Sequence, residues 1–147
     1  MKWKFKNKYI KDPPKEVYGF VYKVTCKLDE YKDWIYIGSK SFYKNRTTVL
    51  SKKKANELYL GKGRKPKKQK VTTESDWKDY ITSSETIKTL VNTFGNEAFN
   101  WEIIDYGLTK ADLLMKEVEM QVKYRVFRIK ESFNQMLKAS IYKKNLI

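Results

Sequence analysis

The chain has 147 residues, with 32 Lys and Arg against 17 Asp and Glu and a formal net charge of +15. This length suits one domain, and a content of 41% hydrophobic and 15% aromatic residues excludes a disordered chain. The sequence has no histidine and one cysteine, Cys26, which excludes histidine-dependent triads, histidine-metal sites and cysteine-based zinc cages.

The N-terminal half predicts a basic arm followed by a β-hairpin. Residues 1–16 alternate lysine with mostly aromatic side chains before Pro13-Pro14, which is typical of a strand or extended arm with one face on the protein. Residues 17–26 and 34–39 are rich in β-branched and aromatic side chains and are separated by a short polar turn. These two segments predict an antiparallel pair of strands.

The C-terminal half predicts helices around a third strand. Residues 75–80 suggest a short helix capped by Ser75. The next helix begins after Ser83 or Ser84 and ends at Gly95. Its apolar residues recur at the helical period: Ile87, Leu90, Val91 and Phe94.

The third strand covers residues 98–107, and the longest helix covers 109–130 with a capping box from Thr109 and Asp112. The order predicts a single α+β domain over 1–147, with a core at about 17–137 and a basic tail at 138–147. We expect a three-stranded antiparallel sheet flanked by helices, with a basic loop inserted.

Most of the net charge lies in residues 44–70, which contain eleven Lys and Arg against one acid, Glu57. The Gly and Pro residues at the end of this segment suggest an exposed loop. Clustered charge of this kind favours a polyanion such as nucleic acid, although a solvated lysine-rich surface is the plainer alternative. The candidate DNA-binding residues are Lys44, Lys52, Lys53, Lys54, Lys62, Arg64, Lys65, Lys67, Lys68 and Lys70.

Two tripeptides on the predicted hairpin resemble a known double signature. Phe20-Val21-Tyr22 and then Tyr36-Ile37-Gly38 are similar to the motifs of the GIY-YIG nucleases. Three further residues match that family in order, namely an arginine ten residues after Tyr36, a glutamate on the last helix and an asparagine after it. These are Arg46, Glu117 and Asn134. The resemblance covers about residues 17–137 and is strongest to the Seg-type endonucleases of bacteriophages.

The resemblance implies a set of roles for phosphodiester hydrolysis. Glu117 would bind Mg²⁺ or Mn²⁺, and Arg46 would hold a phosphate, which its fork of donors suits. Tyr22 would be the general base and Tyr36 a positioning or phosphate-binding hydroxyl. Tyrosine has a pKa near 10, so Tyr22 needs a nearby cation such as Lys40 to favour its phenolate.

Some positions depart from the family pattern or leave the register open. Phe20 replaces the first glycine, although Gly19 precedes it, and Ser39 stands where many members carry lysine. Arg64 is the alternative arginine, and Glu119 is the alternative glutamate, although Glu117 shares a helix face with apolar residues. We expect Gly38 to let backbone or substrate approach closely.

The resulting hypothesis is a Mg²⁺-dependent endonuclease that cleaves double-stranded DNA as a monomer or transient dimer, with a homing or interference role. The lysine-rich composition and the resemblance suggest a phage-encoded protein of the bacterial cytoplasm. No segment approaches the roughly 18 apolar residues that span a bilayer, so we expect no membrane association. The alternatives are a non-catalytic DNA-binding protein or repressor on the same scaffold, and a basic RNA-associated protein.

Overall fold

The computed structural model describes residues 2–137 and 142–146, and the chain divides into two units. The first unit combines Met1–Phe42 with Asp76–Ile147, and the second is Tyr43–Ser75. The strands of the first unit are β1 (Lys4–Phe5), β2 (Lys8–Tyr9), β3 (Gly19–Cys26), β4 (Ile35–Ser41) and β7 (Phe99–Gly107). Its helices are α2 (Glu85–Phe94), α3 (Lys110–Lys123) and the 3₁₀ turns Asp29–Tyr31, Asn96–Ala98 and Lys143–Asn145.

The sheet has five strands in the order β2-β1-β7-β3-β4, so the prediction of three strands is wrong in number. The two extra strands come from the N-terminal arm, which turns tightly at Lys6 and Asn7 (φ 49° and 65°). Positive φ at both turn residues matches the twist of a two-residue hairpin. All pairings are antiparallel except β1 with β7, where Lys4 lies beside Glu102.

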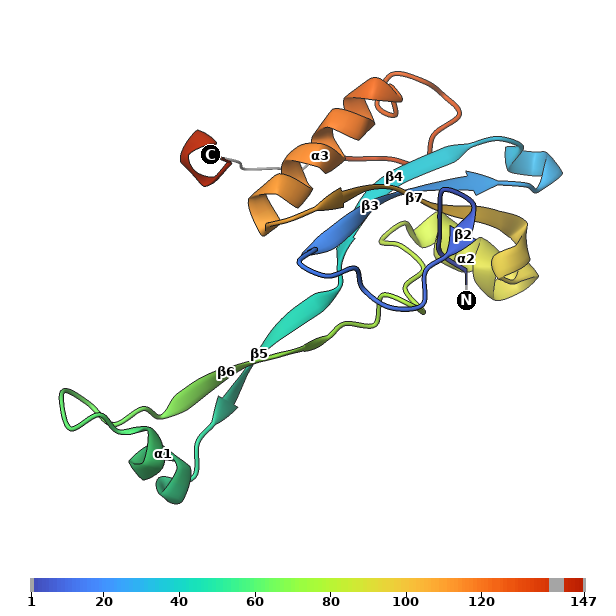
Figure 1. Cartoon of the computed structure of the whole chain (residues 1–147). Helices are drawn as coiled ribbons and strands as arrows, with labels where there is room; N and C mark the ends of the chain where they lie inside the picture. The colour runs from blue at the N-terminus through green and yellow to red at the C-terminus, as the bar shows by residue number, and fades with distance from the viewer. Residues whose placement is uncertain (1, 138–141, 147) are drawn as a thin grey trace. The chain divides into compact units, whose positions relative to one another are not determined.

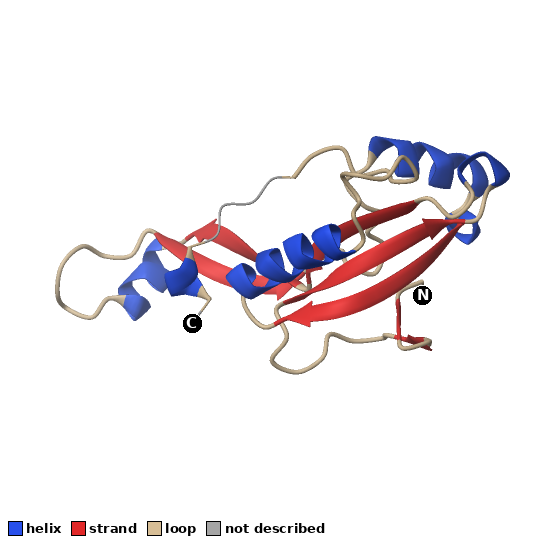
Figure 2. Ribbon diagram, turned by 90° about the horizontal axis from the view of Figure 1, so that it is seen from above, coloured by secondary structure: helices blue, strands red, loops and turns tan. Residues whose placement is uncertain are grey.

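The two faces of the sheet carry different apolar clusters, because side chains alternate along each strand. Aromatic residues of β3, including Phe20 and Tyr22, pack with α2 and with two tryptophans, Trp3 and Trp77, on one face. On the other face α3 covers Val21 and Ile37, and Figures 1 and 2 show this helix lying along the strands. The core therefore sits in two layers around β3 and β7.

A bulge in β7 lies beside Tyr22. Val21 pairs with Asp105 but Tyr22 pairs with Ile103, which leaves Ile104 as the extra residue. Ile104 packs against the α3 cluster, which explains why it breaks the alternation of the predicted strand. Bulges commonly re-aim side chains next to functional sites.

The predicted ends of α2 are confirmed. The Ser84 side chain accepts a hydrogen bond from the Ile87 amide, and Gly95 at the C-terminus has a φ of 83°. The helix expected over 75–80 is wrong, because Trp77 lies in turns. Its carbonyl accepts from the Tyr80 amide at 3.4 Å and from the Trp3 indole at 2.8 Å.

The predicted start of α3 at Thr109 is confirmed, but the helix ends at Lys123 rather than at residue 130. Arg125 has a φ of 55°, and the amides of Arg125 and Val126 donate to the carbonyls of Val122 and Gln121. These bonds form a Schellman motif with arginine in place of the usual glycine. The motif brings Val126 into the α3 cluster, where it is 1% exposed.

The chain after α3 returns along the outer edge of β4. The Ile35 amide donates to the Glu131 carbonyl, and the Phe133 amide donates to the Ile35 carbonyl. Asn134 extends this pairing with its side chain, which accepts from the Ile37 amide at 2.9 Å and donates to the Ile37 carbonyl at 2.8 Å. The edge strand is thus covered, which removes a template for pairing with other chains.

The second unit is a two-stranded ribbon rather than the predicted loop. It contains β5 (Tyr43–Val49), α1 (Lys52–Leu58) and β6 (Lys68–Glu74), with Tyr43 paired to Glu74 and Val49 to Lys68. The segments Thr47–Val49 and Val71–Thr73 supply the β-branched residues that favour strands. The many lysines around these short segments favoured the prediction of a loop. Every residue of this unit is exposed or half-buried.

Within the part of the chain that the structure describes, no helix is long and apolar enough to cross a membrane. Residues 138–141 and 147 of the predicted basic tail lie outside the described residues.

Candidate active site

The Tyr22 ring lies against the backbone of Gly38 on the neighbouring strand β4, where the two residues form a cross-strand pair. A Cβ atom at Gly38 would lie 2.6 Å from Tyr22 Cζ and would also collide with the Tyr22 hydroxyl. Only glycine leaves room for this approach. The sequence predicts that backbone or substrate approaches Gly38, but the group that approaches it in the structure is the Tyr22 side chain.

The Tyr22 hydroxyl is fully buried and makes no hydrogen bond of good geometry within the described residues. Its ring stacks near that of Tyr36 at 6.1 Å and meets Tyr80 edge-on at 6.2 Å. A buried hydroxyl without a partner costs free energy. Such a group is typical of a functional position, because packing alone would favour phenylalanine there.

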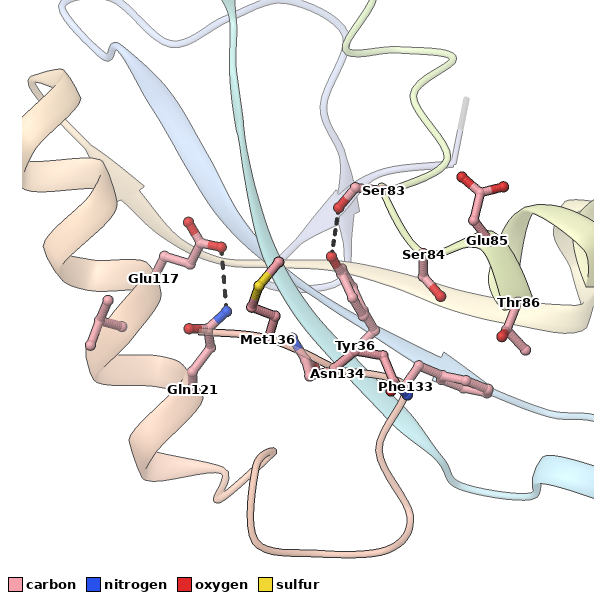
Figure 3. Close-up of a pocket in the computed structure, with 12 residues that line it drawn as sticks. Tyr36, Ser83, Ser84, Glu85, Thr86, Glu117, Gln121, Phe133, Asn134 and Met136 are labelled. Carbon is pink, nitrogen blue, oxygen red and sulfur yellow. Dashed lines mark hydrogen bonds between the residues drawn. The ribbon is translucent and has the colours of Figure 1, made fainter. Parts of the chain in front are cut away.

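Tyr36 extends from β4 toward the loop that precedes α2. Its hydroxyl shares a hydrogen bond of 2.8 Å with the Ser83 hydroxyl, as Figure 3 shows. Thr82, next to Ser83, is buried and has a φ of 146°, an unusual backbone for a β-branched residue. The loop is thus held in a strained conformation where it meets Tyr36.

Glu117 projects from the middle of α3 toward the β4 edge. Its carboxylate accepts from the Ser39 hydroxyl at 2.6 Å and from the Gln121 side-chain amide at 3.3 Å. Gln121 also donates to the Ile37 carbonyl at 3.2 Å, which ties the helix to the strand. No Lys or Arg among the described residues lies within salt-bridge distance of Glu117. Glu119, the alternative glutamate, is exposed.

A pocket of about 520 Å³ at the edge of β4 is lined by Tyr36, Glu117 and Gln121, whereas Tyr22 is not among its lining residues. Glu117 enters it from α3, and Tyr36 enters it from the strand, with Ser83 at its far wall (Figure 3). Asn134 lines the same pocket through the amide that pairs with Ile37. The segment after α3 therefore builds one wall of the site as well as covering the sheet edge.

Partial or complete burial of three groups of the site changes their protonation equilibria. Burial raises the pKa of Glu117, although the Ser39 hydrogen bond partly opposes this. Burial also raises the pKa of Tyr36, and it raises the pKa of Tyr22 well above its ordinary value. After burial, Tyr80 and Tyr36 raise the pKa of Tyr22 further, and the Glu117 carboxylate makes the smallest contribution in the same direction.

Lys40 lies near this site but is engaged elsewhere. Its ammonium forms a 2.7 Å ion pair with Asp76 and lies 4.2 Å from the centre of the Tyr80 ring. The pKa of Tyr22 is raised, which is opposite to the direction that a phenolate base requires. The protein in this state therefore holds Tyr22 as the neutral phenol.

The remaining predicted residues belong to the second unit. Arg46 is exposed on β5, where it pairs with Val71, and Arg64 is exposed in the loop between α1 and β6. The structure therefore groups Tyr22, Tyr36, Glu117, Gly38 and Asn134 within the first unit. The ten predicted DNA-binding residues are all exposed in the second unit: Lys44, Lys52, Lys53, Lys54, Lys62, Arg64, Lys65, Lys67, Lys68 and Lys70.

Three polar residues that hold the site were not predicted from the sequence as site residues. Ser83 contacts Tyr36, while Ser39 and Gln121 contact Glu117. A signal existed for Gln121, because it lies four residues after Glu117 and shares its helix face. Ser39 stands where many family members carry lysine, and its hydroxyl donates a hydrogen bond to the Glu117 carboxylate.

Comparison with known proteins identifies the family of this chain. A family model described as "Putative endonuclease segE, GIY-YIG domain" matches residues 3–141. No curated protein and no solved structure matches the chain significantly. Both tyrosines of the double signature, with Gly38 between them and Glu117 beside them, lie within the matched region. The chain therefore belongs to the GIY-YIG nuclease family, in its Seg-type branch.

Proposed function

We propose that this nuclease is a divalent-metal-dependent DNA endonuclease that hydrolyses phosphodiester bonds of double-stranded DNA. The observation that carries the proposal is a half-buried carboxylate, Glu117, which faces a polar pocket with no cation beside it among the described residues. A carboxylate in this position is costly to the fold unless a partner compensates its charge. A metal ion in contact with DNA is such a partner.

The residues present fit a magnesium or manganese ion better than a fully caged metal. The described residues contain no cluster of three His, Cys, Asp or Glu side chains. Mg²⁺ requires no such cage, because it keeps several water molecules and binds through one or two carboxylates. Glu117 would hold the ion, while Ser39 and Gln121 fix the orientation of its carboxylate. A cation bound there would neutralise charge on the phosphate and leaving oxygen and favour the phenolate of Tyr22.

The side chains of the site then have separate tasks. Tyr22 would accept a proton from the attacking water, which requires that its own proton be lost when the site is loaded with DNA. Tyr36 would orient a phosphate oxygen with its hydroxyl, which Ser83 holds in place. Arg46 would contact a phosphate through its planar fork of donors. Lys40 would assist by contributing positive charge if DNA binding releases it from Asp76.

A nicking assay on supercoiled plasmid tests the proposal. Wild type should relax or linearise the plasmid with Mg²⁺ or Mn²⁺ and should fail with EDTA. Glu117→Ala should bind DNA but lose cleavage by about 10³-fold, because metal-assisted charge stabilisation contributes several kcal/mol. Glu119→Ala is the matched control on the same helix and should cut as wild type does.

Two other outcomes would change the proposed function or the proposed metal ligand. If neither protein cuts several DNA substrates and both bind DNA with a steep salt dependence, the chain is a DNA-binding protein or repressor on a nuclease scaffold. If Glu117→Ala cuts as well as wild type, the metal ligand is a different residue. We further propose a phage-encoded enzyme of the bacterial cytoplasm with a homing or interference role, which a search for cleavage of related phage genomes would test.

A further inference from the structure

The two faces of the β5–β6 ribbon differ in the side chains that they present. Alternation along the strands and the cross-strand register place four residues of each strand on one face, beginning with the pair of Tyr43 and Glu74 at the base of the ribbon and continuing with three pairs beyond it. Asn45 pairs with Thr72, the next pair on this face is Thr47 with Lys70, and the last is Val49 with Lys68. We call these six residues the reading face.

The reading face is exposed throughout. All six residues are exposed, and Val49 reaches 83%, a large value for an apolar β-branched side chain. On the opposite face Thr48 and Thr73 are half-buried, and the Thr73 hydroxyl is fully covered. A two-stranded ribbon with no buried side chain is marginally stable alone in water. Binding of a partner to its surface would therefore add more stability to this ribbon than to a packed domain.

The chemistry of the reading face matches the edges of bases in the DNA major groove. An asparagine amide can bind adenine through two hydrogen bonds, and lysine can donate to guanine. Threonine and valine methyl groups suit the methyl group of thymine. The Asn45 carboxamide is already oriented, because its oxygen accepts a 2.9 Å hydrogen bond from the Thr72 hydroxyl and keeps a second lone pair free.

The shape and charge of the unit fit the same partner. The major groove of B-DNA admits a two-stranded β-ribbon and presents a pattern that distinguishes all four base pairs, whereas the minor groove is narrower and mainly separates A·T from G·C. Residues 43–75 carry eleven Lys and Arg against Glu57 and Glu74, a net charge of +9. Most of these cations lie outside the reading face, on α1 and in the loop before β6, where they can contact phosphates.

We propose that the reading face of the β5–β6 ribbon enters the major groove and selects the target sequence, with Asn45 recognising an adenine. This inference rests on the proposed function, in which duplex DNA is the substrate. It goes beyond the sequence-based hypothesis, which named only Lys and Arg residues of this segment as candidates for DNA binding. Backbone contacts set affinity and register, whereas base contacts set sequence preference.

Selection from a random duplex library tests the inference. The full chain carrying Glu117→Ala is used in EDTA, so that bound DNA is not cut, and the enriched duplexes are sequenced. The same selection is repeated with Asn45→Ala, with Thr72→Val and with Lys62→Ala, each added to Glu117→Ala. Thr72→Val removes the hydroxyl that orients the amide, and Lys62→Ala removes one cation of the loop.

The variants should separate base reading from backbone contact. Asn45→Ala should lower affinity for the selected duplex about ten-fold and leave affinity for a scrambled duplex within about two-fold. Thr72→Val should have a smaller effect in the same direction. Lys62→Ala should weaken both duplexes equally and reduce the slope of log K against log salt by about one.

A modified base gives the sharpest result. Replacing the preferred adenine by 7-deazaadenine removes its major-groove acceptor and should weaken the Asn45 protein about ten-fold. The Asn45→Ala protein should not distinguish the two bases. If 7-deazaadenine has no effect, or if Asn45→Ala weakens both duplexes equally, the inference is overturned.

The inference and the proposed function can fail separately. If the wild type cleaves plasmid DNA but no sequence is enriched through Asn45, the proposed nuclease function stands and the inference about the reading face is excluded. If enrichment depends on Asn45 but the wild type does not cleave DNA, the inference stands and the protein is a sequence-specific DNA-binding protein rather than a nuclease. The absence of any enriched sequence would exclude the reading face, whatever the cleavage result.

Discussion

The two units of this nuclease differ in how many side chains they bury and in how much charge they carry. The first unit buries large aromatic side chains on both sides of Tyr22, whereas the second unit buries none of its side chains fully. The second unit nevertheless carries +9 of the +15 net charge, from eleven cations and two acids. Chemistry needs side chains fixed by packing, whereas attraction to DNA needs charge that remains in contact with water. The chain separates these requirements between its units.

The largest expected effect tests whether Tyr22 is retained for chemistry. Tyr22→Phe should lower the cleavage rate by about 10²–10⁴-fold, the range of general acid–base catalysis. It should not lower Tm, because the deleted hydroxyl is buried and makes no hydrogen bond of good geometry within the described residues. Single-turnover cleavage and thermal unfolding are the measurements. A Tm loss with unchanged cleavage would show that the hydroxyl is structural.

The next effect contrasts a glycine of each unit. Gly38→Ala should destabilise the first unit by about 2–3 kcal/mol, because its Cβ would lie 2.6 Å from Tyr22 Cζ. Gly63→Ala is the control, since an added Cβ there meets nothing within 4 Å and only the φ of +70° is unfavourable. Denaturant unfolding followed by tryptophan fluorescence reports the first unit. Equal stability of wild type and Gly38→Ala would contradict the tight packing at Gly38.

A charge deletion in the second unit should change binding without changing stability. Replacing Lys52, Lys53 and Lys54 by alanine should weaken DNA binding about ten-fold at 0.15 M salt and reduce the salt slope by about three. Alanine favours helices, so α1 should persist. The control replaces three exposed lysines of the first unit and should leave the slope nearly unchanged: Lys27, Lys32 and Lys130. Equal effects of the two triple variants would remove the distinction between the units.

The smallest effect is a pH dependence of stability at Glu117. Burial raises the pKa of this carboxyl, so the folded protein binds more protons than the unfolded chain between the two pKa values. The free energy of unfolding of wild type relative to Glu117→Gln should therefore fall as pH rises through that window. Urea titrations without metal at pH 4 to 7 measure it. A difference that rises with pH would reverse the sign of the pKa shift.

Elements with local capping signals were predictable from the sequence, and elements fixed by tertiary contacts were not. The ends of α2 follow from Ser84 and Gly95, which carry their own capping chemistry. The end of α3 does not, because Arg125 takes a left-handed conformation that the packing of Val126 compensates. The pairing of β1 with β7 joins residues nearly 100 positions apart and has no local signal.

The candidate site shows the same division. Tyr22, Tyr36 and Glu117 are predicted from their order along the chain. The structure places Tyr36 and Glu117 at the pocket beside β4, and it places Tyr22 in the core on the adjacent strand β3. The direction of the Tyr22 pKa shift was not predictable, because it depends on burial that exists only in the folded protein. Ser39, Ser83 and Gln121 are small or neutral side chains whose role depends on a bond to another residue.

The way in which the ribbon is joined to the rest of the chain affects how such an enzyme can evolve. Because the ladder of the second unit starts at the pair Tyr43 and Glu74, the chain enters and leaves this unit at neighbouring points. A segment with adjoining ends can be exchanged as a cassette, much as a surface loop tolerates insertions. Mutations that retarget the protein would then accumulate in one short stretch of the gene, and the stretches that encode cleavage could stay unchanged. If the ribbon selects the target as proposed, a lineage built this way could acquire new DNA targets without evolving a new catalytic unit.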